Sequence, residues 1–240
     1  MNEKVSERKF DEEYFNTNEF FKKDPWGFGR SPYELNKYKR QIDLIKALIS
    51  PKPEVENILE VGCAEGIFTE MLLKEFPNSK ITGIEFSKNA FKRAKKRLES
   101  YGERVELIQG DIVEKAKELP EMNFDIATMS EVILYIGNDF SFTTINDSVF
   151  YPVAKSLELG GGLVIAQIVE QKGYPEGPLT KKPIIHSYKT MLAEQHILKK
   201  VYDESFLEYK DEENQVFNYE IWGFRRVDEK KEPHWRWRKV

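Results

Sequence analysis

The sequence contains little cysteine and little histidine, with one Cys and three His among 240 residues. The lone Cys63 cannot form an internal disulfide, and so few thiol and imidazole groups argue against a zinc site. No apolar run approaches the roughly 20 residues that a bilayer-spanning helix needs. The stretch Met1–Glu13 also lacks the apolar core of a signal peptide. We therefore expect a cytoplasmic protein with no bound metal, no disulfide and no membrane segment.

A strong excess of charge of one sign is also lacking. The 37 Lys and Arg residues against 41 Asp and Glu residues give a formal net charge of -4. A slightly acidic chain is a poor candidate for wrapping a long nucleic acid. The end His234–Lys239 is basic and contains tryptophan, so it could stack on bases or sugars, or simply pack against the domain. We expect a small-molecule partner; the composition does not indicate an oligomeric state.

Short apolar runs alternate with helix-like stretches from residue 57 onward, which is typical of βαβ units. The runs span 57–61, 80–85, 105–109, 125–129 and 162–169, with helix-like segments near 67–76, 88–100, 112–119 and 145–158. Two later runs, His196–Tyr209 and Val216–Arg226, predict an antiparallel hairpin that closes the sheet. The pattern predicts an α/β fold with a seven-stranded, mostly parallel sheet, helices on both faces and an antiparallel last strand.

The first 50 residues differ from the rest of the chain. They begin as a polar and aromatic stretch, and a single helical stripe of apolar residues follows. Ser31 and Pro32 have the residue types of an N-cap and a first helical position. The predicted helix runs to Ile49, just before Pro51. We expect one overall domain, in which residues 1–50 form a helical cap and residues 51–240 form the main body.

Three features suited to a nucleoside ligand follow successive predicted strands. Gly62 and Gly66 flank a turn between a strand and a helix, where free N–H groups can face a ligand. Glu85 ends the second strand, where a carboxylate can accept hydrogen bonds from both hydroxyls of a ribose. Asp111 ends the third, where it could accept from an adenine amino group; the alternative for each acid is an N-cap. Because the carboxyl ends of parallel strands meet at one edge of a sheet, we expect these residues in one cleft.

Over about residues 57–170 these motifs resemble the class I S-adenosylmethionine-dependent methyltransferases. The resemblance implies a Rossmann-like fold and S-adenosylmethionine as cofactor. The cofactor-binding residues that it implies are Glu60, Gly62 and Gly66 at the methionine part, Glu85 at the ribose, Asp111 and Ile112 at the adenine, and Ser130 near the methyl group. Trp26 is a further cofactor-binding candidate, as an aromatic wall residue beside the methyl group. Ala64 stands where many members have glycine. Alanine is the smallest replacement, so we expect a slight change in the turn and retained binding.

A narrower resemblance, to the nodulation protein S group, rests on three short segments. They are Asp24-Pro25-Trp26, Ser31-Pro32-Tyr33-Glu34 with Lys37-Tyr38, and Ser130–Tyr135. Members of that group N-methylate the free amine of a deacetylated chitooligosaccharide. The resemblance implies an amine acceptor on a sugar-like or natural-product molecule, with the cap acting as a lid over the site. In the alternative interpretation, Trp26 and Tyr33 only pack the first helix onto the sheet.

The catalytic candidates follow from the chemistry of an amine acceptor, which must lose a proton before or during attack. Glu131 and His186 could take that proton or orient the amine, and Tyr33 could line the wall beside the reacting atoms. The alternatives are that Glu131 caps a helix and that His186 is a solvated loop residue. Other functions stay open: O-methylation, RNA- or protein-directed methylation, an NAD-dependent dehydrogenase, or a non-catalytic cofactor-binding protein.

Overall fold

The computed structural model describes residue 29 and residues 31–49, 54–172, 182–210 and 215–228. Trp26, most of the loop before residue 182 and the tail His234–Lys239 lie outside the described residues, as does most of the predicted cap. Within the described ranges, no helix is long and apolar enough to cross a bilayer.

The helices and strands alternate along the chain. The helices are α2 (Pro32–Ile49), α3 (Ile67–Glu75), α4 (Lys88–Leu98), α5 (Ile112–Lys115), α6 (Ile133–Asp139), α7 (Phe142–Ile145), α8 (Tyr151–Lys155) and α9 (Lys182–Glu194). The strands are β1 (Asn57–Val61), β2 (Lys80–Glu85), β3 (Val105–Gln109), β4 (Phe124–Ser130), β5 (Leu157–Lys172), β6 (Leu198–Lys210) and β7 (Gln215–Arg226). Segments of 3-10 helix span Glu99–Arg104 and Ala116–Glu121, and a π-helical turn spans Asn146–Phe150.

The seven described strands form one sheet in the order β3-β2-β1-β4-β5-β7-β6. Neighbours among the first five strands pair in parallel, while β7 pairs antiparallel with both β5 and β6. The predicted fold class is therefore confirmed. The sheet grows from β1 toward β3 on one side and from β1 toward β4 on the other. Such a switch in direction opens a crevice at the carboxyl ends of the strands.

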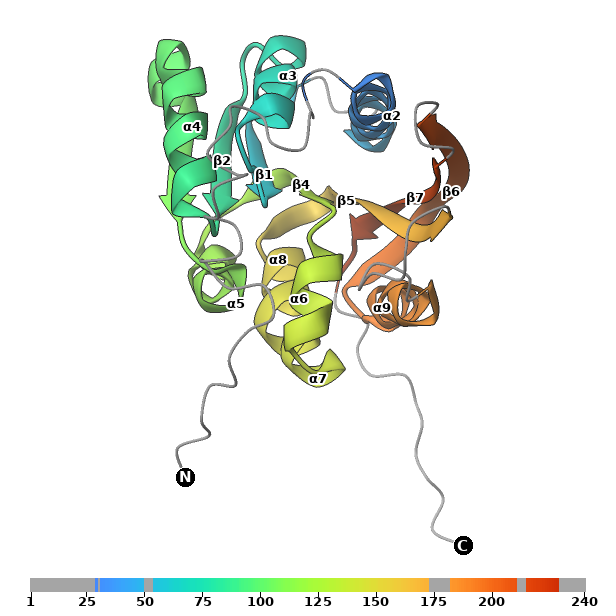
Figure 1. The fold of residues 1–240 in the computed structure, drawn as a ribbon. Coiled ribbons are helices and arrows are strands. Elements are labelled where there is room, and N and C mark those ends of the chain that lie inside the picture. The colour runs from blue at the N-terminus through green and yellow to red at the C-terminus, as the bar shows by residue number, and fades with distance from the viewer. Residues whose placement is uncertain (1–28, 30, 50–53, 173–181, 211–214, 229–240) are drawn as a thin grey trace, which may run out of the picture.

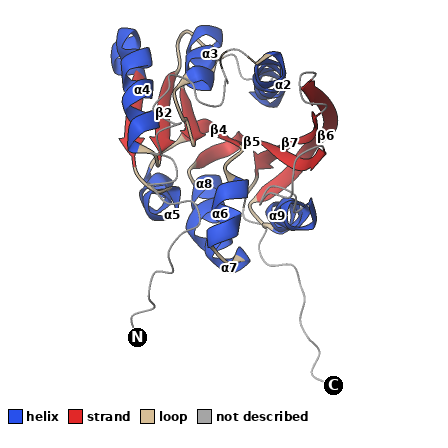
Figure 2. Ribbon diagram, viewed as in Figure 1, coloured by secondary structure: helices blue, strands red, loops and turns tan. Residues whose placement is uncertain are grey.

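Helices cover both faces of the sheet. Figure 1 shows α2, α3 and α4 on one side and α5 to α9 on the other, and Figure 2 shows the strands as the layer between them. Side chains alternate between two cores: Ile58 of β1 packs with α2 and α3, whereas Leu59 packs in the opposite cluster. Fully burying one such side chain stabilises the fold by roughly 1.5–3 kcal/mol.

Helix α2 shares one of these cores with the central strands. Its first residue, Pro32, is the one predicted from the sequence, and Ile45 and Leu48 are buried against β5 and neighbouring strands. Arg225 Nη2 of β7 also donates to the Leu48 carbonyl at 2.7 Å. The boundary at residue 50 and the lid role stay predictions, because residues 1–28 lie outside the description.

Two predicted helices are shorter or less regular than their sequence pattern indicates. The helix expected at 112–119 is a single α-helical turn followed by 3-10 helix that contains Pro120, because proline removes a backbone donor and crowds the preceding turn. The helix expected at 145–158 ends at Lys155, and β5 begins two residues later. Strand β5 is longer than predicted because its outer part continues to pair with β7.

Candidate active site

The turn after β1 bends through left-handed backbone conformations. Gly62 and Gly66 have φ values of 74° and 75°. The N–H groups of Gly62 and Cys63 both donate to the Ile84 carbonyl, at 2.8 and 3.1 Å, which fixes the turn against β2. A Cβ at Gly62 would lie 2.6 Å from Val132 Cγ2, and a Cβ at Gly66 would lie 2.8 Å from Leu98 Cδ1. Both glycines are therefore required by conformation and by close packing.

Ala64 occupies the middle of the same turn with φ of 48°. A left-handed conformation costs a non-glycine residue roughly 1–2 kcal/mol. The Ala64 N–H donates to Glu85 Oε2 at 2.8 Å, and this bond holds the strained residue in place. The turn thus keeps its shape with alanine at this position.

Glu85, at the end of β2, organises two loops at once. Its Oε1 accepts from the Ser87 N–H at 2.7 Å while its Oε2 accepts from Ala64. Burial raises the pKa of Glu85, and the backbone donors of Ser87 and Ala64 oppose that rise. Since a carboxylate can accept about four hydrogen bonds, capacity remains for the hydroxyls of a ligand.

Asp111 is an N-cap, as one of the two alternatives from the sequence has it, and it also lines the pocket. Its Oδ1 accepts from the Val113 N–H at 3.0 Å and caps the start of α5. Asp111 is 8% exposed, and together with Ile112 it lines the same pocket as Glu85. Capping fixes the orientation of the carboxylate at the pocket wall.

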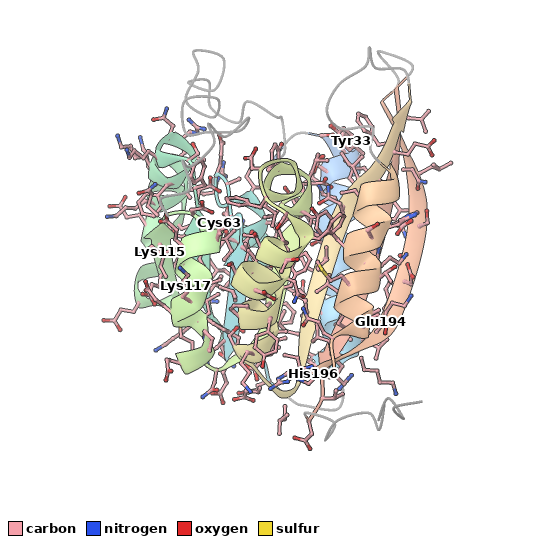
Figure 3. All side chains as sticks on the ribbon, turned by 90° about the horizontal axis from the view of Figure 1, so that it is seen from below. Tyr33, Cys63, Lys115, Lys117, Glu194 and His196 are labelled. Atoms are coloured by element: carbon pink, nitrogen blue, oxygen red, sulfur yellow. The ribbon has the colours of Figure 1, made fainter. Side chains whose placement is uncertain are left out.

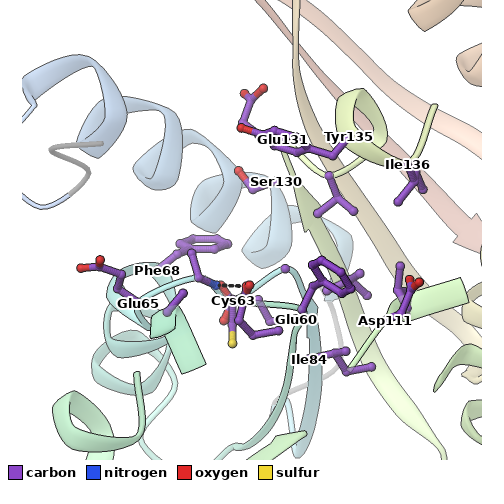
Figure 4. A pocket seen from close by; sticks show the side chains of 18 of the residues that line it. Glu60, Cys63, Glu65, Phe68, Ile84, Asp111, Ser130, Glu131, Tyr135 and Ile136 are labelled. Atoms are coloured by element: carbon purple, nitrogen blue, oxygen red, sulfur yellow. Dashed lines mark hydrogen bonds between the residues drawn. The ribbon is translucent and has the colours of Figure 1, made fainter. Parts of the chain in front are cut away.

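A single pocket brings most of the predicted site residues together. Its walls come from the turn after β1, the ends of β2 to β4, the first half of α2, and α6. It includes these predicted residues: Glu60, Gly62, Glu85, Asp111, Ile112, Ser130 and Glu131. Figure 4 shows Ser130, Glu131 and Tyr135 on one side of the pocket, and Glu60, Cys63 and Ile84 on the other. The pocket therefore lies between the turn after β1 and the residues that follow β4.

Gly66, Tyr33 and His186 do not line this pocket. Gly66 is the N-cap of α3 and packs against α4. Tyr33 stacks on Phe217 with ring centroids 5.6 Å apart, beside β7 and away from Cys63 (Figure 3). His186 Nε2 of α9 lies 2.9 Å from Glu220 Oε1. Tyr33 and His186 therefore have no contact with the pocket that supports an acceptor-side role.

Glu131 follows β4 in an unusual conformation. It is a non-glycine residue with φ of 61°, and such strain persists only where the surroundings hold it. Its Oε2 accepts from Gln167 Nε2 at 2.9 Å and from the Ile168 N–H at 3.0 Å, and its Oε1 lies 3.4 Å from Lys37 Nζ. Burial raises the pKa of Glu131 to about 7, against the lowering effect of Lys37.

Lys37 is a pocket residue that the sequence analysis did not assign. Its side chain is fully buried, its Nζ lies 2.6 Å from Glu34 Oε2, and it faces the ring of Tyr219 at 5.1 Å. Burial lowers the pKa of Lys37, but Glu34 and Glu131 outweigh burial and raise it. The sequence contains a signal for a buried Lys37, because Lys37 and Gln41 lie on the same helical stripe as the apolar residues Leu44 and Leu48.

Two arginines of α4 also hold the turn and were not singled out from the sequence. Arg97 Nε donates to the Glu65 carbonyl at 2.9 Å, and Arg93 Nε lies 2.6 Å from Glu65 Oε1. Glu65 lines the pocket and is 1% exposed. Through Arg93 and Arg97, helix α4 thus holds the loop between Gly62 and Gly66 in place.

Comparison with known families decides what kind of enzyme domain this is. A family model described as a methyltransferase domain matches residues 54–229. The chain belongs to this methyltransferase family. The resemblance drawn from the glycine turn and the two strand-end acids is thereby confirmed.

The relatives of this methyltransferase act on different acceptors by name. It is 28% identical over 180 residues to malonyl-[acyl-carrier protein] O-methyltransferase 2 of Ilyobacter polytropus, covering 74% of this chain and 65% of that protein. It is 30% identical over 115 residues to nodulation protein S of Rhizobium tropici, covering 48% of this chain and 44% of the other. The matched parts span less than two thirds of either relative.

Among solved structures, the fold is similar to the N-methyltransferase NodS of Bradyrhizobium japonicum in complex with S-adenosyl-L-homocysteine. The TM-score is 0.65 at 22% identity, covering 85% of this chain and 93% of that one. This likeness extends the resemblance to the nodulation protein S group from sequence to fold.

Glu60 of this methyltransferase is a buried carboxyl group inside the pocket. It is 3% exposed, and Thr69 Oγ1 donates to its Oε2 at 2.6 Å. Burial raises the pKa of Glu60 to about 7, and the Thr69 bond opposes that rise. The carboxyl group therefore changes charge near neutral pH in the folded chain.

We predict that Glu60→Gln stabilises the free protein at alkaline pH. A carboxyl whose pKa is raised on folding binds its proton more tightly in the folded state, so stability falls as pH rises from about 4.5 to about 7. Glutamine removes this loss, although its weaker bond with Thr69 offsets part of the gain. Between pH 5.5 and 8.5 the free energy of unfolding of the variant should gain about 1–2 kcal/mol relative to the wild type.

Urea unfolding at the two pH values measures this difference. Glu106→Gln, at an exposed position on β3, controls for loss of one negative charge. Equal pH dependence in the wild type and Glu60→Gln would contradict the prediction.

Proposed function

We propose that this methyltransferase uses S-adenosylmethionine as methyl donor and methylates an amine of a small polar molecule of sugar-like or natural-product type. The observation that carries the acceptor class is the charge of the pocket. Of the described residues that line it, six are acidic and one, Lys37, is basic. Lys37 is already paired with Glu34 and Glu131. A cationic or N–H-donating acceptor fits such a lining better than a carboxylate does.

The residues of the turn and strand ends fit the cofactor. We assign Glu85 to the ribose hydroxyls, Asp111 and Ile112 to the adenine, and the turn from Gly62 with Glu60 to the methionine part; in support, all of these residues line one pocket. When bound, the cofactor supplies a methyl group on a sulfonium, which is already activated for transfer. The protein's contribution is to orient the acceptor and to exclude water.

Two glutamines lie behind the pocket wall, beside Ser130 and Glu131. Gln41 Nε2 lies 3.3 Å from Ser130 Oγ, and Gln167 Nε2 donates to Glu131 Oε2 at 2.9 Å. Neither glutamine lines the pocket, and their buried amide oxygens have no hydrogen-bond partner within the described structure. The carboxylate that lines this part of the pocket is therefore that of Glu131, and it favours an amine as acceptor.

In the proposed reaction, Glu131 takes the proton that an ammonium acceptor must lose. A water molecule could otherwise accept this proton, but Tyr38, Tyr135 and Phe140 line the pocket, and their aromatic rings disfavour water there. The neutral acceptor nitrogen would then take the methyl group that the cofactor supplies, as the carbon–sulfur bond breaks with its electron pair staying on sulfur and the positive charge passes from sulfur to nitrogen. A water-excluding aromatic wall favours this step because the charge is spread over both atoms in the transition state.

The proposal predicts binding of S-adenosylhomocysteine by calorimetry and transfer of methyl from S-adenosylmethionine to a primary amine. A chitooligosaccharide with one deacetylated sugar is the first acceptor to test, with the fully acetylated oligosaccharide as the control that differs only in lacking the free amine. A malonyl thioester is the carboxylate probe, chosen because the relative from Ilyobacter polytropus is named for methylating malonyl-[acyl-carrier protein]. Mass spectrometry then reads the methylated product.

Each outcome has a distinct consequence. Methylation of the free amine alone supports the proposal. Methylation of a carboxylate probe with none of the amine would overturn the acceptor class while keeping the cofactor, and failure to bind S-adenosylhomocysteine would overturn the cofactor as well.

A further inference from the structure

A cluster of charges, with Glu34 and Lys37 buried and Glu131 partly buried, joins helix α2 to the acceptor side of the pocket. Glu34 and Lys37 lie one turn apart on the same face of α2, and Glu131 reaches this pair from the loop after β4. Glu34 and Lys37 are 4% and 0% exposed. Buried ion pairs add little stability over apolar side chains of the same size. A cluster of this kind beside an active site therefore calls for a functional explanation.

We propose that Lys37 and Glu34 are positioning residues for Glu131: Lys37 keeps its carboxylate ionised and oriented, and Glu34 limits that effect by competing for the lysine. The proposal rests on the proposed function in so far as Glu131 receives the acceptor's proton. The distances from Lys37 Nζ to the two carboxylates show which of them the lysine is closer to. Lys37 Nζ is 2.6 Å from Glu34 Oε2 and 3.4 Å from Glu131 Oε1, so the closer partner is the one outside the pocket lining.

The surroundings of Glu131 contain both groups that favour its charged form and groups that oppose it. From β5, Gln167 Nε2 and the Ile168 N–H donate to its carboxylate. From β7, the Tyr219 hydroxyl faces the cluster and donates to Glu34 Oε1 at 3.2 Å. Burial raises the pKa of Tyr219 well above its ordinary value, so the phenol stays neutral. Lys37 is thus the group in the described cluster that supplies positive charge.

The proton balance of the reaction explains why such tuning matters. The ammonium group of the acceptor gives one proton to the Glu131 carboxylate, which leaves a neutral amine and a neutral carboxyl group. A base acts best when its pKa lies near the working pH. Lys37 lowers the pKa of Glu131 and Glu34 raises it, so the two residues act on this base in opposite directions.

The test is the titration of the Glu131 carboxyl carbon by NMR in protein labelled with 13C-glutamate, without cofactor or acceptor. Glu131→Gln assigns the signal by its disappearance. Lys37→Met should move the titration midpoint to higher pH by at least about one unit, and Glu34→Gln should move it to lower pH. Lys37→Arg keeps the positive charge and should leave the midpoint within about half a unit of the wild type. Circular dichroism verifies that each variant is folded.

Opposite shifts in Lys37→Met and Glu34→Gln support the proposal, and unchanged midpoints, or shifts in the same direction, overturn it. If Lys37→Met does not fold, a lowered midpoint in Glu34→Gln with an unshifted Lys37→Arg supports it, and any other pair of results overturns it. The titration is independent of turnover. Opposite shifts in a protein that methylates no amine would therefore overturn the proposed acceptor class and leave the coupling of the three residues intact.

Discussion

Gly62→Ala is expected to lower the free energy of unfolding by about 2–5 kcal/mol and to abolish measurable binding of S-adenosylhomocysteine. Two effects add at this position. The φ of 74° places a Cβ in the left-handed region, at a cost of roughly 1–2 kcal/mol. That Cβ would also lie 2.6 Å from Val132 Cγ2, and such overpacking costs about 1–3 kcal/mol. Thermal and denaturant unfolding, with calorimetry of the ligand, measure both losses.

Gly160→Ala is the matched control for the conformational part. Gly160 has φ of 85°, but a Cβ there meets no atom within 4 Å. Its substitution should cost only about 1–2 kcal/mol. Adding Val132→Ala to Gly62→Ala should recover part of the contact loss, because the crowding methyl is removed. A Gly62→Ala protein no less stable than Gly160→Ala would show that the close approach to Val132 is not a constraint.

The fold could be predicted from the sequence where a single physical rule dominates. The order of the strands with their separating helices follows from apolar runs of strand length, and the elements β1, β2 and β3 have the predicted bounds. Where two physical rules compete, the sequence predicts the secondary structure less well. Between Ala116 and Glu121 helical periodicity competes with Pro120, and the result is a 3-10 segment that periodicity alone does not indicate.

The pocket was predictable only where its residues follow strands directly. Glu85 and Asp111 lie at strand ends, whose meeting at one sheet edge is a consequence of parallel topology. Lys37 reaches the pocket from α2, some 90 positions before Glu131 in the sequence, and nothing local in either segment pairs them. The sequence signal for such a residue is a polar start, at Lys37 and Gln41, to a helical stripe that continues with Leu44 and Leu48.

Glu85→Ala is expected to weaken binding of S-adenosylhomocysteine by about 3 kcal/mol, which is about a hundredfold. The carboxylate accepts from the N–H groups of Ala64 and Ser87, so its loss leaves both donors without their partner. It also removes the acceptor that we propose for the ribose hydroxyls. Even Glu85→Gln should bind weakly, because its amide NH₂ must face one of the two backbone donors. Calorimetry at fixed pH measures both variants, with Glu106→Ala as the control for an exposed acid.

A double-mutant cycle separates the ribose contact from support of the loops. The ligand change is from S-adenosylhomocysteine to its 2′-deoxyribose analogue, and the protein change is Glu85→Ala. If the carboxylate binds the hydroxyl, removing the hydroxyl should weaken binding to the wild type but hardly affect binding to the variant, since the interaction is already gone. Equal weakening of both proteins by the deoxy ligand would assign Glu85 to holding the turn at Ala64 alone. The ribose would then need another acceptor in the pocket.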